Sequence, residues 1–126
     1  MDSKQLALLC RKIAEDKKAE NTVVLDVRKL SSVTDFFVVM SATSEPHLRA
    51  LAAAIAEKVE EESGLRPRAV DGSLRASWMI MDYVDAMVHI MRADSRSHYD
   101  LEGLWGDAPR LKARKPRLRK STRKAP

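Results

Sequence analysis

Two apolar runs separated by a short acidic turn constrain this chain more than any other feature. Residues 78–81 and 86–91 are apolar except for His89, and Asp82, Tyr83, Val84 and Asp85 lie between them. Runs of this length around a polar turn predict a β-hairpin that is buried on at least one face. We expect the rest of the fold to be organised around this hairpin.

The N-terminal part predicts a helix followed by two strands. Apolar residues recur at helical spacing over residues 4–17, and a β-branched run at 22–27 is typical of a strand. Residues 36–40 are apolar at every position, which favours a central strand. A short polar link joins the two strands, so an antiparallel pair is the simplest arrangement.

A second helix is expected over residues 45–62, between two clear end signals. Ser44 suits the N-cap, Pro46 suits the first turn, and Gly64 suits the residue just beyond the C-terminus. A serine-rich entry to a helix can also bind phosphate. Because no glycine-rich loop or following lysine is present, we favour ordinary capping.

Further elements complete the expected fold. Residues 66–70 predict a short strand, which Pro67 places at an edge or a strand start, and residues 95–104 predict a short helix. The sum is an α/β or α+β single domain, with helices packed on a mixed sheet of about five strands. We expect this domain over residues 1–109, followed by a basic disordered tail over residues 110–126.

The net charge of +5 belongs to the tail. Residues 110–126 hold nine Lys or Arg and no acid, which leaves 14 basic against 18 acidic residues up to Pro109. Cations of this density can neutralise phosphates, so the tail predicts a nonspecific ribosomal RNA contact. A solvated tail without a defined site is the alternative, since no aromatic residue is present to stack on bases. The candidate RNA contacts are Arg114, Lys115, Arg117, Arg119 and Lys120.

The sequence favours a cytoplasmic protein. No apolar run approaches the ~20 residues of a membrane span, and the N-terminus lacks the apolar stretch of a signal peptide. The single cysteine, Cys10, cannot form an internal disulfide and fits a reducing compartment. Its position on the apolar side of the first helix predicts a small buried side chain rather than a reactive thiol.

Catalytic and metal-binding patterns are absent from the sequence. The three histidines do not pair with Cys10 at metal-ligand spacing, and no phosphate-binding loop, dinucleotide fingerprint or nucleophile elbow occurs. Asp82 and Asp85 could serve as an acid–base pair or bind Mg²⁺, but two acids around a hairpin are more often turn residues. We therefore expect a protein that is not an enzyme and needs no cofactor or metal.

A protein-contact surface is the remaining interpretation of the aromatic residues. Large aromatic side chains edged by charges have the composition of an interface, although core packing explains them equally well. On a strand, His89 alternates onto the face of Met87 and Met91, where a core or groove position is expected. The candidate partner-binding residues are Trp78, Asp82, Tyr83, Asp85, His89, Tyr99, Glu102, Leu104 and Trp105.

An ordered set of short blocks resembles the ribosomal silencing factor family, also called Iojap-like proteins. The similarity spans about residues 5–109, and only the complete set is specific. Glycine is frequent in the family where Ala42 and Val84 stand here, so the hairpin turn is expected to differ slightly. The blocks are residues 24–27, 30–38, 41–44, 70–72, Trp78, 82–85, 88–89, Arg96, 99–102 and 104–105.

The resemblance implies a nucleotidyltransferase-like fold that has lost its catalytic motif, since no Gly-Ser with a paired Asp-x-Asp is present. It further implies binding to protein number fourteen of the large ribosomal subunit, at the face that meets the small subunit. A protein bound there sterically blocks subunit association and represses translation. Trp78, Tyr99, Leu104 and Trp105 would be apolar anchors, and Asp82, Asp85 and Glu102 would pair with cations of the partner.

Other functions stay open from the sequence alone. An RNA-binding ribosome-assembly factor would act chiefly through the basic tail, and a nucleotidyltransferase-like enzyme would show nucleotide-dependent turnover. An exposed strand edge or apolar patch could also support a homodimer.

Overall fold

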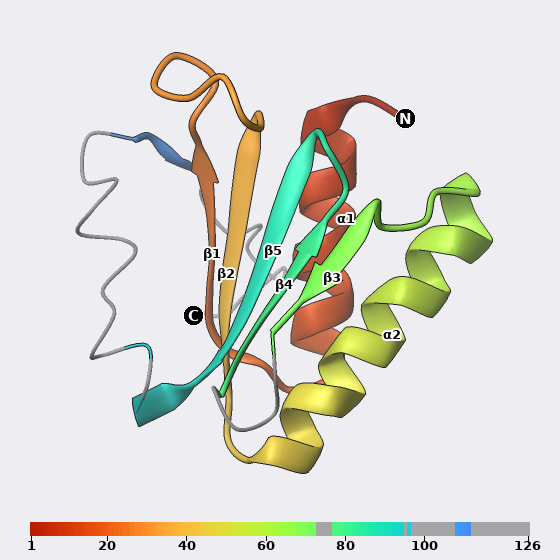
Figure 1. The fold of residues 1–126 in the computed structure, drawn as a ribbon, viewed down its shortest axis with the longest axis vertical. Coiled ribbons are helices and arrows are strands. Elements are labelled where there is room, and N and C mark those ends of the chain that lie inside the picture. Colours follow the sequence, from red (N-terminus) through yellow and green to blue (C-terminus); the bar gives the residue numbers. More distant parts are fainter. Residues whose placement is uncertain (73–76, 95, 97–107, 112–126) are drawn as a thin grey trace, which may run out of the picture.

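The computed structural model describes residues 1–72, 77–94, 96 and 108–111. In this part of the chain, two helices lie against the same face of one six-stranded sheet (Figure 1). The expected α+β single domain with a mixed sheet is therefore confirmed, with one strand more than expected.

Both helices begin and end where local side chains satisfy their terminal backbone groups. In α1 (Ser3–Asp16), the side chain of Asp2 accepts from the Gln5 amide and the Gln5 side chain accepts from the Asp2 amide. In α2 (Glu45–Ser63), the Ser44 hydroxyl accepts from the His47 amide. Gly64 follows α2 in the left-handed conformation, as predicted for a C-terminal glycine.

The sheet has the order β3-β4-β5-β2-β1-β6. β2 (Phe36–Ala42) lies inside it with every residue buried, and it runs parallel to β5 (Ala86–Arg92). The other pairs are antiparallel. The predicted pairing of β1 (Glu20–Asp26) with β2 is confirmed, and so is the predicted hairpin of β4 (Trp78–Asp82) with β5.

Two elements differ from expectation. The edge strand β3 (Ala69–Asp71) begins later than the predicted strand at 66–70. β6 (Arg110–Leu111), which the sequence did not predict, pairs with β1, so the sheet includes two residues of the predicted tail. The guanidinium of Arg11 in α1 also donates to the Leu111 carbonyl at 3.1 Å. A two-residue basic strand has no periodicity to reveal it, and only its partner β1 defines it.

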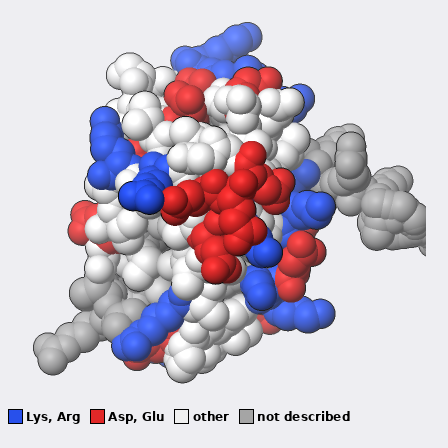
Figure 2. Space-filling view, turned by 90° about the vertical axis from the view of Figure 1, so that its right-hand side faces the viewer, with Lys and Arg blue, Asp and Glu red and all other residues white. Residues whose placement is uncertain are grey.

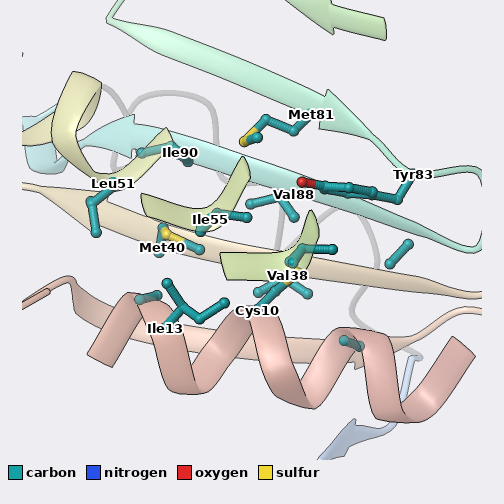
Figure 3. Close-up of a cluster of buried hydrophobic side chains, with 14 of the residues drawn as sticks. Cys10, Ile13, Val38, Met40, Leu51, Ile55, Met81, Tyr83, Val88 and Ile90 are labelled. Carbon is teal, nitrogen blue, oxygen red and sulfur yellow. The ribbon is translucent and has the colours of Figure 1, made fainter. Parts of the chain in front are cut away.

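The main core fills the space between the sheet and the two helices. Figure 3 shows side chains from α1, α2 and the central strands meeting there, among them Cys10, Met40, Ile55 and Ile90. Burial raises the pKa of the Cys10 thiol to about 12, because the thiolate would lose its hydration. Cys10 is thus the small buried side chain that the sequence predicts. The short helix expected at residues 95–104 lies mostly outside the described residues.

Val84 occupies a backbone conformation that its side chain disfavours. It lies in the hairpin turn with φ of 72°, and 46% of its surface is exposed. A β-branched residue in the left-handed region costs about 1–2 kcal/mol, and glycine avoids this strain. We therefore expect Val84→Gly to raise the free energy of unfolding by about 1 kcal/mol in urea denaturation.

Val33 supplies the control for this prediction. It is also an exposed valine, but its φ is not positive. Val33→Gly should lower stability, because glycine at that position relieves no strain and only raises the conformational entropy of the unfolded chain. If both substitutions destabilise the protein equally, Val84 is not strained.

Candidate functional site

The face of the sheet opposite the helices carries a second, smaller apolar cluster. Alternate residues of β1, β2 and β5 point to this face, and none of the described helical residues of α1 or α2 packs over it. We call this set the open-face cluster, because no described helix covers this face; most of its members are themselves buried. It contains Val23, Leu25, Val27, Phe37, Val39, Trp78, Met87, Met91 and Ala108.

Trp78 and His89 are joined at the margin of the open-face cluster. The indole Nε1–H of Trp78 donates to His89 Nδ1 at 3.2 Å, and the ring centroids lie 5.9 Å apart at a tilt of 47°. On its other side His89 meets Phe37 edge to face, with centroids 5.1 Å apart. Trp78 is half-buried, so part of its ring reaches the surface. The structure thus brings together two of the predicted contact residues.

The hydrogen bond from Trp78 fixes the protonation of His89. Only 6% of the His89 surface is exposed, and burial lowers its pKa to about 4. The imidazole is therefore neutral near pH 7. Because an indole can only donate, Nδ1 must be the unprotonated nitrogen and Nε2 must carry the hydrogen. Nε2 is buried and has no hydrogen-bond partner among the described residues.

Asp82 is a turn residue held by local contacts. Its carboxylate accepts from the Val84 amide at 2.8 Å and from the Arg68 guanidinium at 2.6 Å. Desolvation acts to raise the pKa of Asp82, but these hydrogen bonds and the Arg68 charge outweigh it and hold the pKa below its ordinary value. Asp85 is exposed, and its carbonyl accepts from the Asp35 amide. Of the two acids, Asp85 is thus the more accessible to a partner.

Tyr83 lies on the other side of the sheet from Trp78. Its side chain lies in the helix-side core with Met81 and Val88, and 6% of its surface is exposed (Figure 3). Burial raises the pKa of its hydroxyl, and the hydroxyl has no partner among the described residues. The prediction of a surface role for Tyr83 is not supported by this position, because a core side chain cannot anchor a partner.

Arg96 was not singled out as a site residue from the sequence, yet it is buried beside the open face. Its guanidinium donates to the Asn21 carbonyl and to the Ser41 hydroxyl, the latter at 3.0 Å. It therefore ties the chain after β5 to β1 and β2. A lone arginine in a polar stretch gives no sign of this role except its place in a family block. The predicted contacts Tyr99, Glu102, Leu104 and Trp105, and those of the tail, lie outside the described residues.

The acidic surface of the described chain lies elsewhere. Figure 2 shows Asp and Glu gathered on the side of the molecule that carries α2, where Glu57, Glu60, Glu61 and Glu62 are exposed. The described residues hold no group of three or more His, Cys, Asp or Glu that could bind a metal ion. Neither described helix is long and apolar enough to cross a membrane.

Comparison with known proteins supports one family. All of residues 1–126 match the family model described as "Ribosomal silencing factor during starvation". The chain is 37% identical over 109 residues to ribosomal silencing factor RsfS of Halalkalibacterium halodurans, covering 86% of this chain and 92% of that protein. It is 29% identical over 111 residues to a chloroplastic protein Iojap of Arabidopsis thaliana, covering 87% of this chain and 45% of that protein.

A crystal structure shares the fold. The X-ray structure of a protein from Chromobacterium violaceum matches with a TM-score of 0.79 and 30% sequence identity, over 84% of this chain and 88% of that chain. This chain therefore shares its overall fold with that protein.

Proposed function

Because this chain belongs to the ribosomal silencing factor family, we propose that it binds the large ribosomal subunit and blocks its association with the small subunit. In this proposal the partner is protein number fourteen of the large subunit, at the face where the subunits meet. A folded domain bound there leaves no room for the small subunit, and translation falls. The match of the family model to the whole chain carries the proposal.

The geometry supports the margin of the open-face cluster as the contact surface. Trp78 offers a half-buried aromatic ring beside apolar side chains, and Asp85 lies exposed at the far end of the same hairpin. Aromatic anchors with a charged rim are typical of protein interfaces. We propose Trp78 as an apolar anchor and Asp85 as a rim charge. Tyr99, Glu102, Leu104 and Trp105 complete this surface in the proposal.

The exposed acids of α2 and the proposed contact surface around Trp78 lie on opposite sides of the sheet. Charge attraction from α2 can therefore steer a basic partner during approach, but short-range contact is left to the Trp78 surface. Adding salt should slow association more than it speeds dissociation.

A ribosome-assembly factor that binds RNA is the second candidate, favoured by the nine cations of residues 110–126. The two functions differ in how much of the binding depends on the tail. If the folded surface binds, the tail adds only a salt-dependent contribution. If RNA binding by the tail is the main function, its removal abolishes binding.

Sedimentation of purified subunits tests the proposal. Separated subunits are mixed with the protein under Mg²⁺ concentrations that favour joining, and the gradient is read for bound protein and for joined ribosomes. We expect the protein to sediment with the large subunit and the joined peak to fall. The matched tailless variant ends after Leu111, because Arg110 and Leu111 belong to the sheet.

The outcomes distinguish the candidates. Retained binding and anti-association by the tailless variant support the folded surface as the site. Binding that disappears with the tail favours the RNA-binding function. Failure of both forms to sediment with large subunits contradicts the silencing proposal for this chain.

A further inference from the structure

We propose that His89 is a positioning residue that holds the indole of Trp78 in the orientation in which Trp78 meets its partner. The inference rests on the proposed function, because it assumes that Trp78 is an anchor of the contact surface. His89 would act through Trp78 and would not itself touch the partner.

Trp78 needs such support because of its place in the fold. It is the first residue of β4, and it pairs in register with Met91 near the end of β5. The preceding residue, Ser77, has φ of 58°, so the chain turns sharply just before the tryptophan. Because β4 extends only from Trp78 toward Asp82, the residues before Trp78 do not continue the strand. A large side chain at a strand start depends on lateral contacts for its orientation.

His89 is well placed to give that lateral contact. It lies inside the sheet on β5, where β4 pairs on one side and β2 on the other. The Phe37 ring meets it edge to face on the β2 side, and the Trp78 indole donates to it on the β4 side. A side chain that is 94% buried between two rings has little rotational freedom, so its Nδ1 acceptor is a fixed point for the indole N–H.

The buried Nε2 of His89, which has no acceptor in the described part of the chain, indicates that His89 serves more than packing. With Nδ1 accepting from Trp78, the Nε2–H is buried without an acceptor among the described residues, which destabilises the fold. An apolar ring at this position would fill the space without that penalty. What histidine supplies here, and an apolar ring does not, is the Nδ1 acceptor. We infer that the acceptor is kept for its effect on Trp78.

A fixed indole would improve binding by lowering the entropy lost when the anchor is immobilised against a partner. The same ring, free to rotate, would have to be ordered during association. His89 would thus raise affinity without adding any contact of its own.

A double-mutant cycle tests the inference in the full-length chain. His89→Phe keeps an aromatic ring and removes the acceptor, and His89→Asn offers a side-chain oxygen as an alternative acceptor. Trp78→Phe keeps a ring and removes the indole N–H. For each variant, affinity for purified large subunits and the unfolding midpoint are measured. The Trp78 indole N–H signal is followed by NMR and assigned by its loss in Trp78→Phe.

We expect His89→Phe to weaken binding roughly three- to tenfold when Trp78 is present and to have no further effect in the Trp78→Phe background. His89→Asn should bind within about twofold of the original chain and keep a shifted indole signal. Should His89→Phe not fold, His89→Leu, which also removes the acceptor, takes its place in the cycle, alone and with Trp78→Phe.

Several results would overturn the inference. One is an equal loss of binding from His89→Phe with and without Trp78, because His89 would then act on the sheet as a whole. Another is unchanged binding by His89→Phe, and a third is loss of binding by a folded His89→Asn. If the original chain does not bind large subunits, the proposed function fails. The indole signal then still reports separately whether His89 holds Trp78, and an unchanged signal in His89→Phe contradicts it.

Discussion

Replacing Gly72 by alanine should lower the free energy of unfolding by about 3 kcal/mol. A Cβ at this position would lie 2.3 Å from the Trp78 carbonyl oxygen and 2.9 Å from the Met79 Cα, which are backbone atoms that cannot rotate away. Gly72 also has φ of 125°, a conformation that residues with a side chain rarely adopt. Relief requires β3 to move away from β4, the strand that begins with Trp78.

Gly64 is the matched control for this substitution. It too has a positive φ, of 74°, but a Cβ there meets nothing within 4 Å. Gly64→Ala should therefore cost about 1 kcal/mol, the strain of the left-handed conformation alone. Urea denaturation of both variants separates the cost of the backbone clash at Gly72 from the cost of the left-handed conformation. Equal losses at the two glycines would mean that the contact with Trp78 is relieved without cost.

Replacing Arg96 by methionine should also cost about 3 kcal/mol. The buried guanidinium donates to the Asn21 carbonyl and the Ser41 hydroxyl, and methionine removes both of these hydrogen bonds while keeping a long apolar side chain. Arg96 also stands at the start of the segment that carries four predicted contact residues. We therefore expect large-subunit binding to weaken as well, at temperatures where the sheet remains folded.

Arg92→Met is the control for Arg96→Met, because it also removes an arginine, at the end of β5. The Arg92 side chain is 42% exposed and lies 3.6 Å from the Asp94 carboxylate, a surface ion pair of little stability. Its replacement should change the free energy of unfolding by less than about 0.5 kcal/mol. Thermal and urea unfolding of the two variants provide the comparison. If Arg96→Met is as mild as Arg92→Met, Arg96 does not anchor the chain after β5.

Elements with local signals could be predicted from the sequence. Ser44 and Gly64 mark the ends of α2, and the acidic turn marks the β4–β5 hairpin, because capping and turn formation depend on neighbouring residues. The alternation of strand residues also predicts that His89 shares a face with Met87 and Met91. These predictions needed no knowledge of the distant parts of the chain.

Long-range choices could not be predicted in the same way. The parallel pairing of β2 with β5 and the short β6 depend on residues far apart in sequence, for which periodicity gives no signal. Tyr83 and Trp78 look alike as aromatic residues near a polar turn, yet Tyr83 points into the helix-side core. Which side of a sheet the helices cover is decided by packing, so the sequence could not separate the proposed anchor, Trp78, from the core tyrosine.

The parallel pairing of β2 with β5 also governs how the protein can fold during its own synthesis. Partners such as Val39 and His89 lie ~50 residues apart, and pairing over such separations slows folding. While the chain is being translated, β2 has no β5 to pair with until the second half has left the ribosome. The edge of β1 stays open longer still, until Arg110 and Leu111 emerge. The nascent domain therefore exposes unpaired strand edges for most of its synthesis, and chaperones that shield such edges should raise its yield.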